Sequence, residues 1–380
     1  MNPSSLYRAA LLISLGLGVV ACAGQPPIER SPGLSRMDLL NGELFGLSVN
    51  ERPAEVELTA VNEEMKAFLR ERVPEDLSDQ RKSELILGAI LTDGLQLSYS
   101  SFKTYSAQET FRTREGNCLS FTNLYVALAR EAGLNTRYQE VDMPITWTSR
   151  GNIYMYNLHV NALVKLPGRE QIIDFDQGAF NADFPRRPIS DTAILAQYHN
   201  NLSVHWLGEG DLPNAFLHIR AALEIDPETD YFWTTLGTLY RRGGHFPEAE
   251  AAYLLAVEIN NERVAMSNLA RLYAQIDEPE LAAWYRDRVD LFRLKNPYYL
   301  FDLAEEAYAG SHYVEAEKLL RRAIRMHRDE PEFYRLLGLT YMRMNEFDKA
   351  EHRFQQAANL ATTDEQRARY NHKLQLLAGH

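Results

Sequence analysis

Small residues recur with a period of 33 or 34 residues through the second half of the chain, and no other feature constrains the fold as strongly. Alanines are spaced by 34, 33, 34 and 34 residues, at Ala215, Ala249, Ala282, Ala316 and Ala350. Small residues also lie twelve positions before each of them, at Ser203, Gly237, Ala270, Ala304 and Gly338. Such a period indicates stacked units, each of which buries its apolar face only against its neighbours.

The repeated unit has the pattern of a helix pair. Small residues are needed where the two helices of a unit touch, and an aromatic residue nine positions before the alanine fills the space between units in four of the five units. This pattern resembles the tetratricopeptide repeat. The resemblance implies five repeats over residues 196–364 and a polar capping helix over residues 365–380. Because stacked repeats build an extended concave surface, it also implies a protein or peptide partner.

The middle of the chain changes to mixed patterning. A helix is predicted from about residue 117 to 132, with Gly133 as its stop. Short β-like runs follow it, at residues 136–141, 158–166 and 171–175. A Pro-Gly turn separates the last two runs, which predicts a hairpin. A helix followed by antiparallel strands indicates an α+β layer fold, and we assign residues 37–195 to this domain, with a helical N-terminal part.

The chain has only two cysteines, Cys22 and Cys118, too few for a disulfide scaffold or a cysteine-rich zinc site. Cys118 follows Gly116 and Asn117 and falls in the first turn of the predicted helix. Backbone N–H groups and the positive end of the helix dipole favour a thiolate there, and the thiolate is the nucleophilic form. Cys118 is therefore a candidate nucleophile. A buried, inert cysteine is the alternative.

The candidate partners of this cysteine lie on the predicted hairpin. His159 is near the start of one run, and Asp174 and Asp176 are near the end of the next. In a simple hairpin, residues 159, 161 and 163 share a face with residues 174 and 176. A histidine oriented by a carboxylate beside a thiolate would form a catalytic triad. A metal site made by the cysteine, the histidine and an acid is an alternative, but it lacks a clear fourth ligand.

Four features together resemble the transglutaminase-like superfamily of papain-type thiol enzymes: a Gly-x-Cys helix opening, an Ala-Leu-Ala-x-x-Ala-Gly-Leu helix end, a strand-initial histidine and an aspartate fifteen residues later. The resemblance implies that Cys118 is the nucleophile, His159 the general base and acid, and Asp174 the orienting acid. Asp176 is the rival for the last role, and Asp174 is preferred because the family's form is two apolar residues followed by Asp. The family's usual aromatic residue two positions after the histidine is Asn161 here, and we expect this departure to leave the triad untouched.

The first 24 residues have the pattern of an export signal. Arg8 is their only charged residue, and residues 9–21 are small or apolar apart from Ser14. This stretch has the length of a signal-peptide core and is too short to span a bilayer.

The signal ends in Val-Val-Ala followed by Cys22, which resembles the bacterial lipobox. The resemblance implies a signal peptide over residues 1–21, lipidation of Cys22 and a flexible tether over residues 22–36. Ala23 replaces the aspartate common in inner-membrane lipoproteins, which implies the outer membrane of a bacterial cell envelope, facing the periplasm. An ordinary secretory signal with an incidental cysteine is the alternative.

Composition excludes one class of partner. The chain carries 40 basic and 52 acidic residues, for a formal net charge of −12, whereas a nucleic-acid binder needs a basic surface. Together the resemblances imply an envelope-anchored cysteine acyl-transfer enzyme that acts on peptide or protein amides through a thioester, with hydrolysis favoured over cross-linking and repeats that recruit a protein. We expect no cofactor and no metal. A non-catalytic periplasmic scaffold with an inactive transglutaminase-like domain is the alternative.

Overall fold

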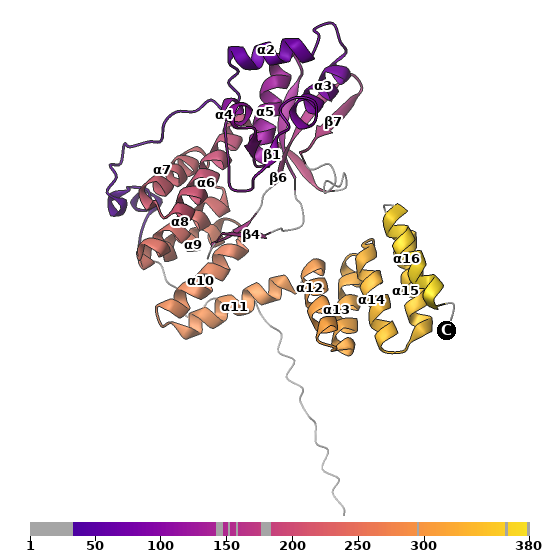
Figure 1. The fold of residues 1–380 in the computed structure, drawn as a ribbon. Coiled ribbons are helices and arrows are strands. Elements are labelled where there is room, and N and C mark those ends of the chain that lie inside the picture. The colour runs from indigo at the N-terminus through magenta and orange to yellow at the C-terminus, as the bar shows by residue number, and fades with distance from the viewer. Residues whose placement is uncertain are drawn as a thin grey trace, which may run out of the picture.

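The computed structural model describes residues 33–141, 147–150, 153–156, 159–175, 184–294, 296–361 and 364–377. The predicted signal peptide, the lipidation candidate Cys22 and the orienting-acid candidate Asp176 lie outside these residues. Figure 1 shows a mixed layer of helices and strands followed by a stack of helices. Among the described helices, none is long and apolar enough to cross a bilayer.

The first part of the chain is an α+β layer, as predicted. Its helices are α1 (Arg36–Leu39), the 3₁₀ turn η1 (Glu43–Phe45), α2 (Glu63–Arg72), α3 (Asp79–Leu91), α4 (Ala107–Thr113) and α5 (Cys118–Glu131). Its strands are β1 (Ser98–Tyr99), β2 (Glu115–Gly116), β3 (Thr136–Val141), β4 (Trp147–Arg150), β5 (Ile153–Tyr156), β6 (His159–Leu166), β7 (Arg169–Ile173) and β8 (Arg186–Ile189). An antiparallel sheet has the order β7-β6-β3-β8, and the predicted hairpin is β6–β7.

Helix α5 is the centre of this domain's core. All of its residues from 119 to 129 are buried. Helices α3 and α4 and strands β3 and β6 all contact it, and its apolar side chains share one core with Ile90, Val164 and Ile173. A helix packed on all sides is held firmly, so its first turn has a well-defined position at the edge of the core.

The N-terminal strap (residues 34–52) does not join this core, although the sequence places residue 37 onward in the first domain. Leu39 and Phe45 instead pack against the core of the repeat helices. The hydroxyl of Tyr240 donates to the Leu39 carbonyl at 2.6 Å, and the buried Arg220 donates to the Ser48 carbonyl at 3.0 Å. The chain reaches the first core from Val56 onward, with Leu58 as its first buried residue there.

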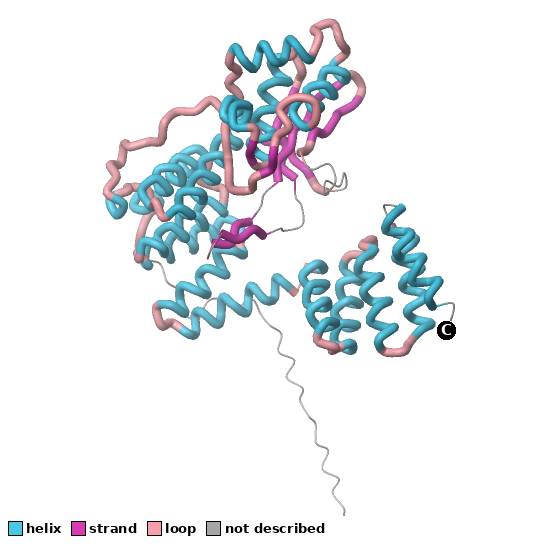
Figure 2. Tube along the Cα trace, in the orientation of Figure 1, coloured by secondary structure: helices cyan, strands magenta, loops and turns pink. Residues whose placement is uncertain are grey.

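The second part of the chain is all helical in its described residues, as Figure 2 shows. Consecutive helices pack in pairs, as the 34-residue period predicts, and α16 packs on α15 at the end of the stack. The helices are α6 (Asp191–Glu209), α7 (Leu212–Ile225), α8 (Asp230–Gly243), α9 (Phe246–Asn260), α10 (Arg263–Gln275), α11 (Pro279–Arg293), α12 (Pro297–Ala309), α13 (Tyr313–Met326), α14 (Pro331–Arg343), α15 (Phe347–Leu360) and α16 (Asp364–Leu377).

The recurring small residue marks the close approach of the two helices in a pair. A Cβ atom on Gly237 would lie 2.6 Å from the Tyr253 ring, and a Cβ atom on Gly338 would lie 3.0 Å from the Phe354 ring. Atoms this close overlap, so a larger side chain at these positions would push the two helices apart.

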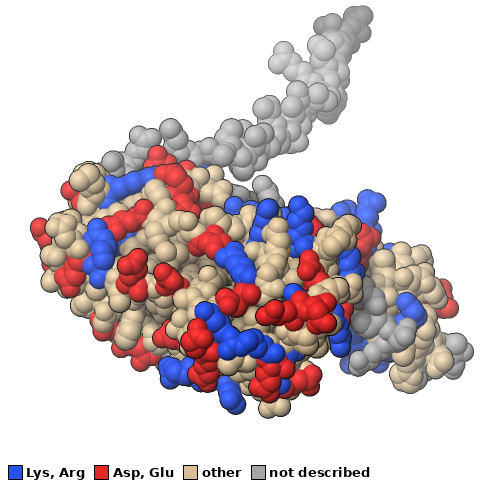
Figure 3. All heavy atoms as spheres, turned by 90° about the horizontal axis from the view of Figure 1, so that it is seen from above, with Lys and Arg blue, Asp and Glu red and all other residues tan. Residues whose placement is uncertain are grey.

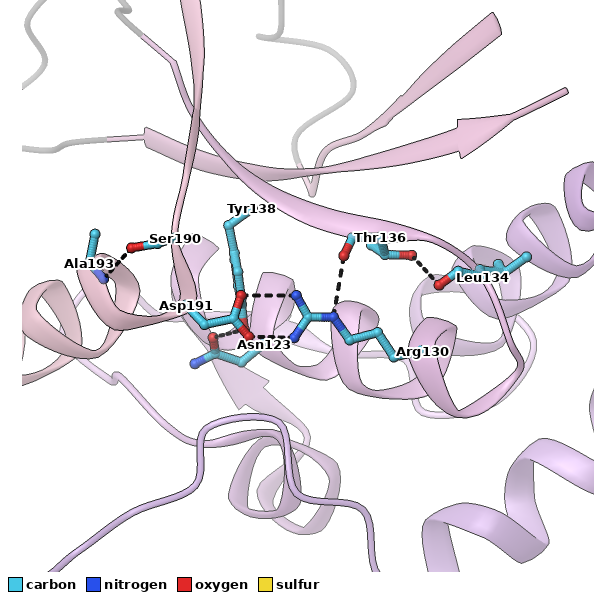
Figure 4. Close-up of polar contacts among 8 residues, drawn as sticks. All are labelled: Asn123, Arg130, Leu134, Thr136, Tyr138, Ser190, Asp191 and Ala193. Atoms are coloured by element: carbon cyan, nitrogen blue, oxygen red, sulfur yellow. Dashed lines mark hydrogen bonds and ion pairs between the residues drawn. The ribbon is translucent and has the colours of Figure 1, made fainter. Parts of the chain in front are cut away.

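Helix α6 belongs to both parts of the molecule. Ile194 and Tyr198 are buried in the core around α5, whereas Leu207 is buried in the core of the repeats. At the start of α6, Asp191 accepts two hydrogen bonds from the Arg130 guanidinium of α5, at 2.5 and 2.9 Å (Figure 4). The predicted limit between residues 195 and 196 therefore falls inside one continuous helix.

Candidate active site

The start of α5 is defined by the residue before it. Asn117 is the N-cap, and its side-chain oxygen accepts from the Ser120 backbone N–H at 3.0 Å. Its Nδ2 donates to the Thr104 hydroxyl at 2.7 Å, and the whole side chain is buried. This cap satisfies one of the N–H groups that a helix leaves without an intrahelical partner, so the helix begins at a defined residue.

Gly116 is required by the close approach of the chain to Ser120. A Cβ atom on Gly116 would lie 2.3 Å from the Ser120 Cβ atom. The Ser120 hydroxyl donates to the Lys103 carbonyl at 3.1 Å and accepts from the Tyr105 backbone N–H at 2.8 Å. Packing therefore explains Gly116, and capping explains Asn117, in the Gly-Asn-Cys sequence at this helix start.

Cys118 is the first residue of α5 and is half-buried at the edge of the domain core. Its carbonyl accepts from the Thr122 hydroxyl at 2.8 Å, and the same hydroxyl lies 3.3 Å from the Val160 carbonyl of β6. Thr122 thus links the first turn of the helix to the strand that carries His159. The sulfur therefore lies at the positive end of the helix dipole.

His159 and Asp174 meet across the hairpin. Nε2 of His159 lies 2.6 Å from Oδ2 of Asp174, and the two side chains are 17% and 3% exposed. The ladder pairs Ala162 with Ile173, so continuing it by one residue places Asn161 opposite Asp174 and His159 diagonal to it. Diagonal neighbours on one face of an antiparallel pair are within reach of long side chains.

The charge state of His159 follows from its neighbours. Burial by itself lowers the pKa of this imidazole, but hydrogen bonds to Asp174 and Cys118 and the charges of both residues outweigh it, so that the pKa rises to about 10. His159 is therefore protonated at neutral pH. Since Nε2 faces Asp174, Nδ1 is the ring nitrogen left for Cys118. The structure thus brings Cys118, His159 and Asp174 together, while their catalytic roles stay a prediction.

Asn161 is the site residue that the sequence missed. We expected this position to leave the triad untouched, and that expectation is wrong. The side chain is fully buried, and its Nδ2 donates to Oδ2 of Asp174 at 2.9 Å. The sequence could have predicted this contact, because the expected hairpin register places residues 161 and 174 on the same face. The prediction considered only the aromatic residue that the asparagine replaces.

Aromatic side chains flank the carboxylate. Phe175 directly follows Asp174, and its ring lies 5.1 Å from that of Phe121 and 5.6 Å from that of Tyr99, between centroids. Tyr99 is 57% exposed. In the described part of the chain, no group of three or more His, Cys, Asp or Glu side chains is placed to hold a metal ion.

Both parts of the chain match known families. Residues 81–170 match the model of the Transglutaminase-like superfamily, and residues 231–263 and 307–370 match models of the Tetratricopeptide repeat. No protein in the curated comparison matches the chain.

Solved structures similar to this chain include three proteins at low identity. The MamA protein is 19% identical, over 46% of this chain and 95% of that one, with a TM-score of 0.25. YrrB, titled a TPR protein with an unusual peptide-binding site, is 16% identical over 46% of this chain and 91% of that one, also at 0.25. The pilF protein of Pseudomonas aeruginosa is 15% identical over 50% and 94%, at 0.27. From the family matches and the observed fold, the chain has a transglutaminase-like domain in its N-terminal region, followed by a helical solenoid of tetratricopeptide-like repeats.

Proposed function

We propose that this protein is a cysteine acyl-transfer enzyme that acts on amide bonds of peptides or proteins. The observation that carries the proposal is the set of contacts made by His159, which hydrogen-bonds both Asp174 and Cys118 at the N-terminus of a buried helix. A protonated imidazole beside a cysteine stabilises the thiolate, and the thiolate is the form that attacks a carbonyl carbon.

The reaction would proceed in two halves. In the first, the Cys118 sulfur attacks the amide carbonyl carbon, and the backbone N–H of Cys118 donates to the oxygen that gains charge. The C–N bond then breaks as the His159 imidazolium gives its proton to the leaving amine, which leaves an acyl thioester on the sulfur. Asp174 holds the ring in place and stabilises its protonated form.

In the second half, neutral His159 takes a proton from water as the water oxygen attacks the thioester carbonyl. The C–S bond breaks, the acyl group leaves as a carboxylic acid, and the thiolate and imidazolium are restored. An amine in place of water would give a cross-link. We favour hydrolysis because water is always present.

The repeats recruit a protein substrate or partner in this proposal. The family matches to tetratricopeptide repeats and the elongated surface of a helical stack support this role. On the face drawn in Figure 3, acidic and basic side chains are interspersed, without one large area of positive charge. A net charge of −12 likewise favours a protein partner over a nucleic acid.

The catalytic proposal is tested by labelling of the purified protein with a thiol-reactive acyl probe at neutral pH. We expect rapid labelling that disappears in Cys118→Ala and slows strongly in His159→Ala. His312→Ala is the matched control, because it removes an exposed histidine from the repeats and should label like the wild type. Slow labelling that does not depend on His159 would contradict the enzyme and favour the scaffold.

We also propose that Cys22 anchors the protein by lipid to the outer membrane of a bacterial envelope, facing the periplasm. The support is the lipobox-like sequence at residues 19–22 and the tether that follows it. A Cys22→Ser variant should leave the membrane fraction, whereas Cys118→Ser should remain there. If Cys22→Ser stays in the membrane fraction, the anchor is not this cysteine.

A further inference from the structure

A buried amide contacts the carboxylate that His159 depends on. Asn161 lies two residues after His159 on β6 and is 0% exposed. Its Nδ2 donates to Oδ2 of Asp174 at 2.9 Å, and this is the same oxygen that lies 2.6 Å from Nε2 of His159. One carboxylate oxygen therefore accepts from two side chains of the neighbouring strand.

This second donor bears on the orientation of Asp174. The Asp174 side chain is only 3% exposed, so its oxygens depend on protein donors for their hydrogen bonds. Asp174 lies just beyond the end of β7, after the last β6–β7 ladder pair, Ala162 with Ile173. A donor fixed on the opposite strand limits rotation of the carboxylate and keeps Oδ2 directed at the imidazole.

The other end of the amide shows that this contact has a cost. The Asn161 Oδ1 atom is buried and has no hydrogen-bond partner among the described residues. An ionised carboxylate can only accept, so the amide must turn Nδ2 toward Asp174 and leave Oδ1 in the core. An unpaired buried oxygen costs free energy that an apolar side chain of similar size would avoid. The neighbours Val160, Ala162 and Leu163 on the same strand are apolar and buried.

We infer that Asn161 is a positioning residue, which holds the Asp174 carboxylate in the orientation that keeps its Oδ2 on the His159 ring and the ring directed at Cys118. The inference rests on the proposed function, because it concerns the same site. It differs from a purely structural role for the amide, which would affect folding stability alone.

Two variants of the mature protein test this role. Asn161→Leu removes the donor at similar volume, and Asn161→Asp keeps the shape but replaces the donor with a carboxyl group. Asn200→Leu is the matched control, because Asn200 is also a buried amide with an unpaired Oδ1 but lies on α6 in the repeats. Each protein is examined for the pKa of His159 by NMR of the imidazole nitrogens, and for the rate at which the acyl probe labels Cys118.

In Asn161→Leu we expect the pKa of His159 to fall by about one unit, a roughly tenfold weaker hold on its proton. We expect labelling at neutral pH to slow by about tenfold or more, because the ring is no longer well oriented. In Asn161→Asp labelling should recover toward acidic pH, where the introduced carboxyl is protonated and can again donate to Asp174. The Asn200→Leu control should keep the pKa and labelling rate of the wild type.

An unchanged pKa of His159 and an unchanged labelling rate in folded Asn161→Leu and Asn161→Asp would overturn the inference. If Asn161→Leu fails to fold, the isosteric Asn161→Asp decides the question alone. Failure of the proposed function looks different, because wild-type Cys118 would then label no faster than a cysteine in the urea-unfolded chain.

Discussion

Replacing Asp174 with Asn should remove most of the interaction that keeps His159 protonated. The amide has the same shape as the carboxylate, so the packing of a side chain that is 3% exposed is preserved while its charge is lost. The pKa of His159 should fall from about 10 toward its ordinary value of about 6.5, since burial continues to lower it and only the contact with Cys118 opposes this.

The size of the effect makes it easy to detect. A fall of about three units corresponds to roughly 4 kcal/mol of interaction with the protonated ring. At pH 8 the protonated fraction of His159 would drop from about 99% to about 10%. Because the protein has 10 histidines, the resonances of His159 must first be assigned from the spectrum of His159→Gln. The titration is then followed by ¹⁵N NMR of the imidazole ring.

A second variant separates the two partners of the ring. Cys118→Ser keeps Asp174 and removes the thiolate, so the pKa of His159 should fall by less than in Asp174→Asn. If Asp174→Asn leaves the pKa near 10, Asp174 is not the orienting acid. Asp176→Asn would then be the informative variant, because Asp176 is the rival that the sequence offers for this role.

Three further predictions concern stability. Gly116→Ala should destabilise the protein by about 1–3 kcal/mol in urea unfolding, because the new methyl group collides with Ser120. Folding raises the pKa of His159 from 6.5 to about 10, so its contribution to stability is full below pH 6.5 and is lost as the pH rises toward 10. Between about pH 7 and 10 the wild type should therefore lose unfolding free energy in urea, whereas His159→Gln should not show this loss. An equal loss in both proteins would contradict the raised pKa of His159. At the junction between the two cores, Tyr198→Ala should cost about 3–5 kcal/mol because its ring is buried, whereas Arg130→Met should cost about 1 kcal/mol or less because its ion pair is partly exposed. If thermal unfolding shows Arg130→Met to be the more destabilised of the two variants, buried packing is not the main contribution at this junction.

Much of the fold could be predicted because its signals are local and periodic. The 34-residue spacing reflects a contact that every helix pair repeats, such as Gly237 against the Tyr253 ring. The triad could be proposed because a two-strand hairpin has few possible registers, and the register that places His159 near Asp174 is the one observed.

The N-terminal strap could not be predicted, because its signal is neither local nor periodic. Leu39 and Phe45 are apolar residues in a short helix and a 3₁₀ turn, and their pattern says only that they will be buried somewhere. Their partners Phe216 and Tyr240 lie far along the chain. The sequence of residues 34–52 alone therefore cannot predict which distant residues the strap will contact.

The position of helix α6 could not be fully predicted either, because its apolar residues pack into two different cores. An amphipathic helix reveals itself by one apolar stripe, but a helix buried on several sides has no single stripe to read. Ile194 and Tyr198 pack toward α5, and Leu207 packs toward the repeats. The 34-residue period assigns the helix to the first repeat. It does not predict that the opposite face packs against α5. The transglutaminase-like domain and the first repeats therefore share this helix, and the N-terminal strap packs on the repeats before the chain enters the first core. The two parts are therefore packed together through a shared helix and are not domains joined by a flexible linker.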